Sequence, residues 1–423
     1  MSRLTSVWST LPSRARRVLV TVVAVVAVVA GAVALRGGDH SDEVSTDRGA
    51  PTSTTSTTTT AALDAASTGF GPGAGSGSAR APGAAKAAPA PAPGPAPAPG
   101  PAPTPATAPP APVTTTTQPV GGPTAPLTGL RIEDPDLVAR PALAVKIDNF
   151  DAPRETAVPQ SGLPGADIVF EELVEGNITR LVAIFHSRQP GRVGPVRSAR
   201  TTDLAILPQF GRALLAWSGG NKGVTAAVRA NPSIIDVGVG VAPGAYARDR
   251  GRRAPHNLYV SADGLFGRAP AGTAGPGPLF QYRTPGQPNP PGAVGSAGVD
   301  LAWGPFSVAP VSWRWDSGTQ LYVRSQAGRA HSDASGKRIT AANVVVLVTP
   351  YGQSPADTRS PEAHTVGSGE ALVYTNGGVI RGRWDRPDVR RPAAISANGA
   401  PILLTPGNTW IELPRGGGAT TVS

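Results

Sequence analysis

The segment Gly194–Thr201 (GPVRSART) combines residue types that bind anions. Ser198 is a suitable N-cap, and the helix that it would begin presents free backbone N–H groups in its first turn. With the guanidinium groups of Arg197 and Arg200 and the hydroxyl of Ser198, these groups could hold a phosphate or a carboxylate. We therefore predict an anion-binding site here, with Arg180 adding charge and Asn221 adding a hydrogen bond.

Nearby glutamates offer another use for these arginines. Glu171, Glu172 and Glu175 could pair with Arg197 and Arg200 inside the domain, because ion-pair networks are common in folded proteins. The glutamates could instead serve acid/base chemistry or hard-metal binding. Adjacent residues on a strand point to opposite faces, so we expect Glu171 and Glu172 to lie in different environments.

A second polar cluster spans Arg248–Asn257 and contains a histidine. His256 could act as a general base with Asp249 orienting its ring, and Glu172 is a further acid/base candidate. Alternatively, His256 follows Pro255 and only forms hydrogen bonds at a strand edge. The sequence leaves both interpretations open.

Several chemistries lack their motifs in this chain. It has no G-x-S-x-G elbow, no P-loop, no dinucleotide-binding glycine fingerprint and no cysteine. No two histidines have the spacing of a zinc site, and no compact basic helix suggests nucleic-acid binding. We therefore expect no metal, no cofactor and no nucleic-acid partner.

The elements that position these residues are preceded by an export signal. Val18–Leu35 is an uncharged apolar run that follows Arg14, Arg16 and Arg17. As a helix it would span roughly 27 Å, and the arginines would keep the N-terminus cytoplasmic. We predict a retained single-pass anchor; the alternative is a signal peptide cleaved after Ala32-Val33-Ala34. In either case the bulk of the chain lies outside the cytoplasm.

The composition of the 423 residues predicts both a stalk and a folded part. Residues 36–125 are rich in Thr, Gly, Pro and Ala, with Phe70 as their single aromatic residue, and we expect them to be disordered. The formal net charge of +10 comes mostly from arginine. That excess favours an anionic partner, although a GC-rich genome would also replace lysine by arginine.

From Pro126 onward, short apolar runs alternate with turn signals. We predict strands over 142–147, 166–174, 181–185, 214–217 and 234–239, and helices over 198–207 and 223–230. This alternation indicates a layered α/β domain with a mixed sheet.

The second half shows strand patterns but no helical periodicity. We predict strands over 311–315, 321–324, 344–349, 371–374, 379–384, 402–404 and 409–413, with a hairpin at Asn376-Gly377-Gly378. These strands indicate a small antiparallel β domain.

Several phrases resemble one bacterial family. They include ARPALAVKIDN (139–149), ADIVFEELVEGNITR (166–180), GPVRSAR (194–200), APHNLY (254–259) and HSDASGKRITAANVVV (331–346). The chain resembles the YerB-like envelope lipoproteins, a family described as domain of unknown function 3048 with N- and C-terminal domains. The resemblance implies an envelope location and this two-part architecture. Because the chain has no cysteine, the membrane helix would replace a lipid anchor.

The predicted layout has seven parts: a cytoplasmic N-terminus (1–17), a membrane helix (18–35), a disordered stalk (36–125), the α/β domain (126–266), a Pro/Gly-rich linker or loop (267–298), the antiparallel β domain (299–416) and a flexible tail (417–423). Our leading hypothesis, which favours a binder over an enzyme, is a membrane-anchored envelope protein whose α/β domain binds an anionic cell-wall polymer. The alternatives are a hydrolase or transferase acting on envelope glycan or phosphoester, and a scaffold that binds another protein through its β domain.

Overall fold

The computed structural model describes residues 122–304 and 307–423. The predicted membrane helix and almost all of the predicted stalk lie outside these residues. Within the described ranges, no helix is long and apolar enough to cross a membrane.

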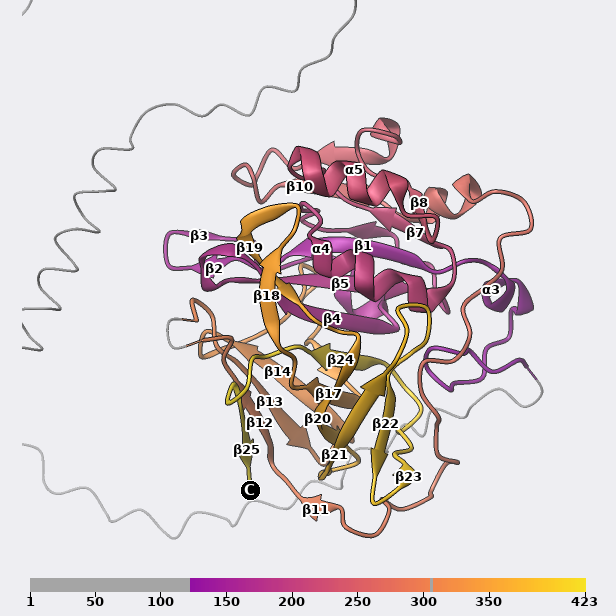
Figure 1. The fold of residues 1–423 in the computed structure, drawn as a ribbon, viewed down its shortest axis with the longest axis vertical. Helices are drawn as coiled ribbons and strands as arrows, with labels where there is room; N and C mark the ends of the chain where they lie inside the picture. Colours follow the sequence, from indigo (N-terminus) through magenta and orange to yellow (C-terminus); the bar gives the residue numbers. More distant parts are fainter. Residues whose placement is uncertain (1–121, 305–306) are drawn as a thin grey trace, which may run out of the picture. The chain divides into compact units, whose positions relative to one another are not determined.

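A 12-stranded mixed sheet runs through both halves of the described chain. Figure 1 shows the strands of the first half in purple and pink above those of the second half in orange and yellow. In order across the sheet the strands are β23 (Ala400–Pro401), β22 (Ala394–Ala397), β21 (Gly378–Arg386), β20 (Gly367–Thr375), β17 (Asn343–Leu347), β24 (Thr409–Glu412), β4 (Ile168–Leu173), β5 (Thr179–Phe185), β1 (Leu143–Asp148), β7 (Ala213–Ala216) and β8 (Ile234–Asp236), and β11 (Val294–Gly295) pairs with β21.

Strand β24 joins the two halves. It lies between β17 and β4 and runs parallel to both. A strand from the end of the chain is thus hydrogen-bonded to one from the beginning of the folded part. The prediction of an antiparallel second half is wrong at this strand, because parallel pairing across the chain leaves no local sequence signal.

Smaller sheets and hairpins pack around the large sheet. A 6-stranded sheet contains β12 (Gly298–Leu301), β13 (Val311–Asp316), β14 (Leu321–Gln326), β15 (Arg329–Ala330), β16 (Thr340–Ala341) and β25 (Ala419–Val422). A 3-stranded sheet contains β6 (Arg192–Val193), β10 (Leu258–Ser261) and β9 (Tyr246–Arg248). Two hairpins pair β2 (Asp151–Ala152) with β3 (Glu155–Thr156), and β18 (Tyr351–Ser354) with β19 (Asp357–Ala363).

Helices are few, so the predicted α/β layering is only partly present. The α-helices in the described ranges are α3 (Pro135–Ala139), α4 (Thr201–Ile206) and α5 (Lys222–Ala230). Short 3-10 turns add η1 (Leu163–Gly165), η2 (Glu175–Asn177), η3 (Leu207–Phe210), η4 (Pro243–Ala245) and η5 (Asp263–Arg268). Two helices, α4 and α5, lie beside β1 and β7 in Figure 1.

The large sheet is buried on both faces, which explains its nearly continuous apolar strands. One face packs against the 6-stranded sheet through Trp303, Trp313 and Tyr322. The other packs against α4, η3 and α5 through Ile206, Phe210, Val224 and Val228. Charged residues on these strands are therefore buried, and each requires a partner.

Most strand predictions are confirmed, with two local corrections. The helix predicted from Ser198 begins at Thr201 instead, with Arg200 as its N-cap, because Arg197 still donates a backbone hydrogen bond to Lys146 on β1. The strand predicted over 402–404 is absent from the large sheet. Leu404 forms a bridge to Tyr282 of the Pro/Gly-rich segment instead.

Candidate functional site

Three charged residues form a row across the middle of the large sheet. In the strand register, Asp148 on β1 lies opposite Arg180 on β5, and Arg180 lies opposite Glu172 on β4. Residues in register on neighbouring strands share a face, so the three side chains lie on the face that α4 covers. All three are buried.

Asp148 brings together two residues that the sequence placed in separate clusters. Its Oδ2 atom lies 2.6 Å from His256 Nδ1 and 3.1 Å from Arg197 Nε. Burial alone would raise the pKa of Asp148, but the His256 hydrogen bond and the Arg197 charge outweigh it and lower the pKa. The carboxylate therefore stays ionised and orients both partners.

His256 lies between two carboxylates. Its ring stacks on Phe150, with 5.4 Å between ring centroids. Its second nitrogen, Nε2, lies 3.2 Å from Oε1 of Glu155, a residue of β3 that is 39% exposed. The side of the imidazole that faces away from Asp148 is thus close to solvent.

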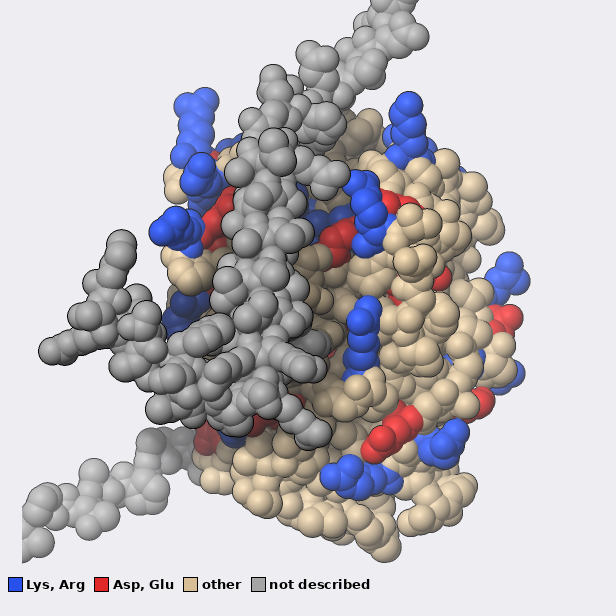
Figure 2. Space-filling view, turned by 60° about the vertical axis from the view of Figure 1, so that its left-hand side comes forward, with Lys and Arg blue, Asp and Glu red and all other residues tan. Residues whose placement is uncertain are grey.

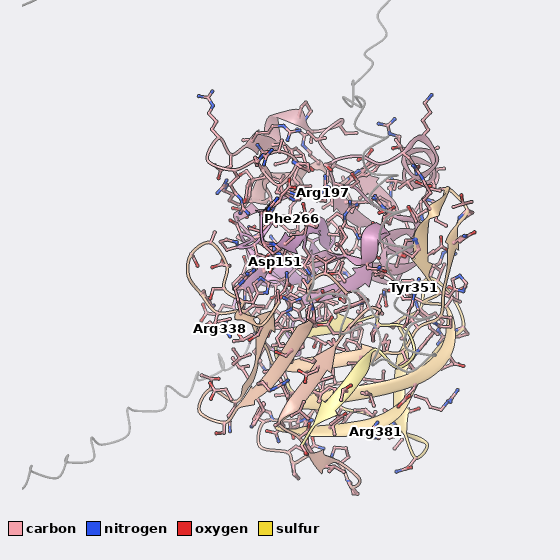
Figure 3. All side chains as sticks on the ribbon, turned by 90° about the vertical axis from the view of Figure 1, so that its left-hand side faces the viewer. Asp151, Arg197, Phe266, Arg338, Tyr351 and Arg381 are labelled. Carbon is pink, nitrogen blue, oxygen red and sulfur yellow. The ribbon has the colours of Figure 1, made fainter. Side chains whose placement is uncertain are left out.

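Arg197 keeps free hydrogen-bonding capacity. Its contact with Asp148 is an ion pair whose geometry leaves Nε without a hydrogen bond in the described ranges. Its side chain is 23% exposed. Figure 3 shows Arg197 in the upper part of the molecule. Arg197 can therefore donate to a bound anion without leaving Asp148.

Arg180 is a buried cation that forms no ion pair with any carboxylate in the described part of the chain. Its Nη1 donates to the backbone carbonyl of Ser198 at 2.8 Å, and its Nε has no partner among residues 122–304 and 307–423. Burial, together with the charges of Arg200 and Arg197, lowers the pKa of Arg180 to about 10. Three guanidinium groups thus lie close enough to repel one another.

Arg200 is neutralised inside the protein. Its Nε and Nη2 donate to both oxygens of Glu175, at 2.7 and 2.8 Å, and Ser360 of β19 also donates to Glu175. Burial would raise the pKa of Glu175, but these bonds lower it to about 2. Such a bidentate pair leaves Arg200 little capacity for a ligand. The internal-pairing alternative therefore holds for Arg200.

Glu172 belongs to a buried triad with Lys146 and Asp203. Lys146 Nζ contacts Glu172 and lies 2.9 Å from Asp203 Oδ1. Burial and the charge of Asp203 raise the pKa of Glu172 to about 7, because one ammonium group cannot neutralise two buried carboxylates. No side chain of the triad is exposed, so Glu172 has no access to a substrate.

Glu171 points to the opposite face of the sheet, as predicted. It accepts hydrogen bonds from Arg324 at 2.6 Å, from Asn149 at 3.0 Å and from Thr179 at 2.7 Å. Glu412 on β24 lies next to it in register. Burial, then the charge of Glu171, holds the pKa of Glu412 well above its usual range.

Other predicted site residues lie elsewhere or contribute only backbone. Asp249 pairs with Arg192 at 2.7 Å on the surface, and Asp148 takes the place predicted for it beside His256. Asn221 caps α5 through the Val224 N–H and donates to Asp357. Ser198 contributes its carbonyl to Arg180.

Sequence reasoning missed the residue at the centre of the site. In the run AVKIDN (144–149), Lys146 and Asp148 alternate with apolar residues, so they share one face of a buried strand. Two charges at this spacing in an apolar strand are the signal that could have identified Asp148. Within the described ranges, no group of three or more His, Cys, Asp or Glu residues could hold a metal ion.

The chain was compared with known proteins. Residues 127–273 match the N-terminal domain, and residues 300–411 the C-terminal domain, of the family described as "Protein of unknown function (DUF3048)". The chain is 30% identical over 297 residues to the Bacillus subtilis (strain 168) protein named "Putative lipoprotein YerB", a match that covers 68% of this chain and 85% of the relative. The crystal structure of the YerB protein from Bacillus subtilis is similar, with a TM-score of 0.62 and 27% identity over 71% of this chain and 99% of that chain. The chain therefore belongs to the DUF3048 family, as the phrases along its sequence indicate.

Proposed function

We propose that this protein is a membrane-attached extracytoplasmic protein that binds an anionic component of the cell envelope. The basic N-terminus followed by an apolar run supports membrane attachment, as does the name of the Bacillus relative. The proposed binding groups are Arg197 and His256, which contact Asp148, and Arg180, which lies opposite Asp148 in the strand register.

The observation that carries this proposal is the burial of Arg180 without an ion pair and with its Nε lacking a hydrogen-bond partner in the described ranges. A buried cation is costly unless it is paired, and here the charges of Arg200 and Arg197 repel that of Arg180, while the carboxylates of Asp148 and Glu175 attract it without forming an ion pair with it in the described ranges. An anion between Arg180 and Arg197 would relieve both the burial cost and the repulsion. The Arg200–Glu175 pair and the Asp148 carboxylate fix the geometry but do not face the ligand.

We expect inorganic phosphate to bind this site and to stabilise the folded protein. A ligand that binds only the folded state raises Tm, so phosphate should raise it above a chloride control of equal ionic strength. Arg197→Gln should weaken phosphate binding about tenfold or more, the cost of losing a charged hydrogen bond. Isothermal titration calorimetry measures the affinity, and circular dichroism checks that the variant is folded.

Two further variants sharpen this test. Arg381→Gln removes an exposed arginine that contacts Glu370 and Thr421 and that lies at the opposite end of the molecule in Figure 3, so its affinity should match the wild type. Glu155→Gln removes the carboxylate next to His256 Nε2 and should bind phosphate more tightly. Equal affinity in wild type and Arg197→Gln would contradict the proposal.

A hydrolase is a second candidate, favoured by the 2.6 Å contact between Asp148 and His256. A carboxylate that fixes the imidazole is the usual arrangement of a general base, and Arg197 lies within the distance of about 10 Å that one site requires. If the protein hydrolyses phosphodiesters, His256→Gln should lower the rate about a hundredfold. The exposed His364, changed to Gln, is the matched control. A wild-type rate no higher than that of His256→Gln would exclude this function and leave binding.

A further inference from the structure

The loop between β9 and β10 carries an unusual density of positive charge. Counted with Arg248, the last residue of β9, residues 248–253 of this basic loop are Arg-Asp-Arg-Gly-Arg-Arg, four cations against one carboxylate. Arg248, Arg250 and Arg253 are exposed. Arg154, at the turn of the β2–β3 hairpin, is exposed as well. Figure 2 shows that basic and acidic side chains are interspersed on the face drawn there, so a local run of arginines is a distinct feature.

This loop is held in place by the remaining polar residues. Asp249 accepts from the Gly251 N–H at 2.9 Å and from Arg192 at 2.7 Å. Arg252 donates to the Pro159 carbonyl and to the Tyr259 hydroxyl, both at 2.7 Å. Holding several arginines next to one another is unfavourable, because their charges repel and a flexible loop would let them move apart. The contacts of Asp249 and Arg252 offset this repulsion and keep the loop ordered.

The ordering contacts leave the other arginines available. In the described part of the chain, Arg250 and Arg253 make no side-chain hydrogen bond or ion pair, and Arg248 donates only to the Asn257 side chain. Such a preorganised basic surface binds an anion without a further entropic cost of ordering the protein.

The basic loop is continuous with the proposed binding site. His256 N–H donates to the Arg253 carbonyl at 2.9 Å, and the same histidine contacts Asp148. Arg252 also donates to the Thr156 carbonyl, which places the β2–β3 hairpin beside the loop. His256 thus links the loop that carries the surface arginines to Asp148, which Arg197 also contacts.

We infer that the ligand is a polyanionic polymer with repeated phosphate groups, which binds along Arg197, His256 and the basic loop. This inference rests on the proposed function, because Arg197 is one end of the path. A single small anion would occupy only one end, whereas a chain of phosphates would neutralise the whole row of cations.

The composition of the loop favours a polymer over a membrane surface. A segment that binds a bilayer combines basic residues with large apolar side chains that enter the interface. The basic loop and the two residues after it contain only Gly251, Ala254 and Pro255 besides charged residues. The exposed large hydrophobic residues in the described ranges are Val241, Val294, Val308 and Val366, none of them in the loop.

The test compares Arg250→Gln/Arg253→Gln with the wild type, using the full chain and long-chain polyphosphate as the probe. We expect the affinity for polyphosphate to fall about tenfold or more, and the slope of log affinity against log salt to fall by about two, one for each lost contact. The affinity for inorganic phosphate should not change, because neither arginine belongs to the Arg180–Arg197 site.

The matched control is Arg381→Gln/Arg383→Gln, which removes the same charge from exposed positions on β21. If the loop variant binds polyphosphate as tightly as this control, the inference is overturned while the phosphate site remains. A loss confined to phosphatidylglycerol vesicles would also overturn it, in favour of a membrane. If wild type binds no inorganic phosphate, the proposed function fails, and the inference fails with it.

Discussion

A chain that ends at Pro406 should fail to fold in either half, because it lacks β24. This strand is hydrogen-bonded to β17 on one side and to β4 on the other, in the middle of the large sheet. Its removal would leave two unpaired strand edges inside the protein, where water cannot satisfy them.

The side chains of β24 add to this loss. Trp410 is buried and packs against Trp313, with 5.2 Å between ring centroids, and Ile411 is buried on the other face. Loss of a buried tryptophan alone costs about 3–5 kcal/mol, and a whole domain is stable by only about 5–15 kcal/mol. The truncated chain should therefore show no cooperative transition in urea, measured by circular dichroism and tryptophan fluorescence.

A chain that ends at Gly416 is the matched control for this truncation. It keeps β24 and lacks β25, which lies at the edge of the 6-stranded sheet and pairs with β12. We expect it to unfold in one transition at a lower urea concentration than the full chain. The prediction would be contradicted if the chain ending at Pro406 kept a cooperative transition.

The position of β24 between the two halves also affects how one could test the hypothesis that the second half is a scaffold for another protein. The two halves that match separate family domains contribute neighbouring strands to one sheet. A pull-down with residues 299–416 alone would expose β24 and the edge that β4 normally covers. Binding by that fragment would report an unpaired strand edge and not a physiological partner.

Local features of the fold could be predicted from the sequence, but the pairing of distant strands could not. The turn Asn376-Gly377 was predictable because both residues adopt positive φ, of 47° and 69°, which a two-residue hairpin turn requires. By contrast, the four residues of β24 have the same apolar pattern whether they pair with a neighbour or with a strand some 240 positions earlier. The entropic cost of closing a loop of chain depends only weakly on the length of the loop. Nothing in the local sequence therefore distinguishes a neighbouring partner strand from a distant one.

In the candidate site, too, local features could be predicted from the sequence, but contacts between distant residues could not. Opposite orientations of Glu171 and Glu172 follow from the two-residue period of a strand, and the structure confirms them. Which glutamate neutralises Arg200 depends on how the turn after β4 approaches α4, and the sequence does not specify that distance. Asp148 was missed because its partners, Arg197 and His256, are separated from it by 49 and 108 positions.

Arg324→Met should produce the largest loss of stability of any single substitution that we propose. Arg324 has no exposed side-chain surface and donates to Glu171 at 2.6 Å and to Gln326 at 2.6 Å. Its guanidinium carbon also lies 5.0 Å from the Trp410 ring centre. It is thus the cation that faces the buried carboxyl groups of Glu171 and Glu412. Methionine preserves most of its length but not its charge.

At neutral pH we expect this substitution to lower the free energy of unfolding by about 3–5 kcal/mol, the usual result of removing one partner of a buried ion pair. Arg314→Met is the matched control on the neighbouring strand, because its partner Asp300 is exposed and such surface pairs contribute about 0–1 kcal/mol. Urea unfolding followed by tryptophan fluorescence measures both variants.

The pH dependence separates lost charge from lost packing. An acid whose pKa is raised by folding, as that of Glu412 is, binds more protons in the folded than in the unfolded state above its ordinary pKa of 4.5. Its stabilising contribution is therefore complete at low pH and is lost as pH rises through the folded-state pKa. The charge of Arg324 lowers the pKa of Glu412, so without Arg324 this carboxyl group should be held protonated more strongly, and the deficit of Arg324→Met should shrink between pH 7.5 and pH 5. The double variant Arg324→Met/Glu171→Gln should recover part of the loss at pH 7.5, since it removes the unpaired charge and keeps the shape.

A deficit that is equal at both pH values, and that Glu171→Gln does not reduce, would mean that Arg324 stabilises the two halves by packing against Trp410 and not by its charge.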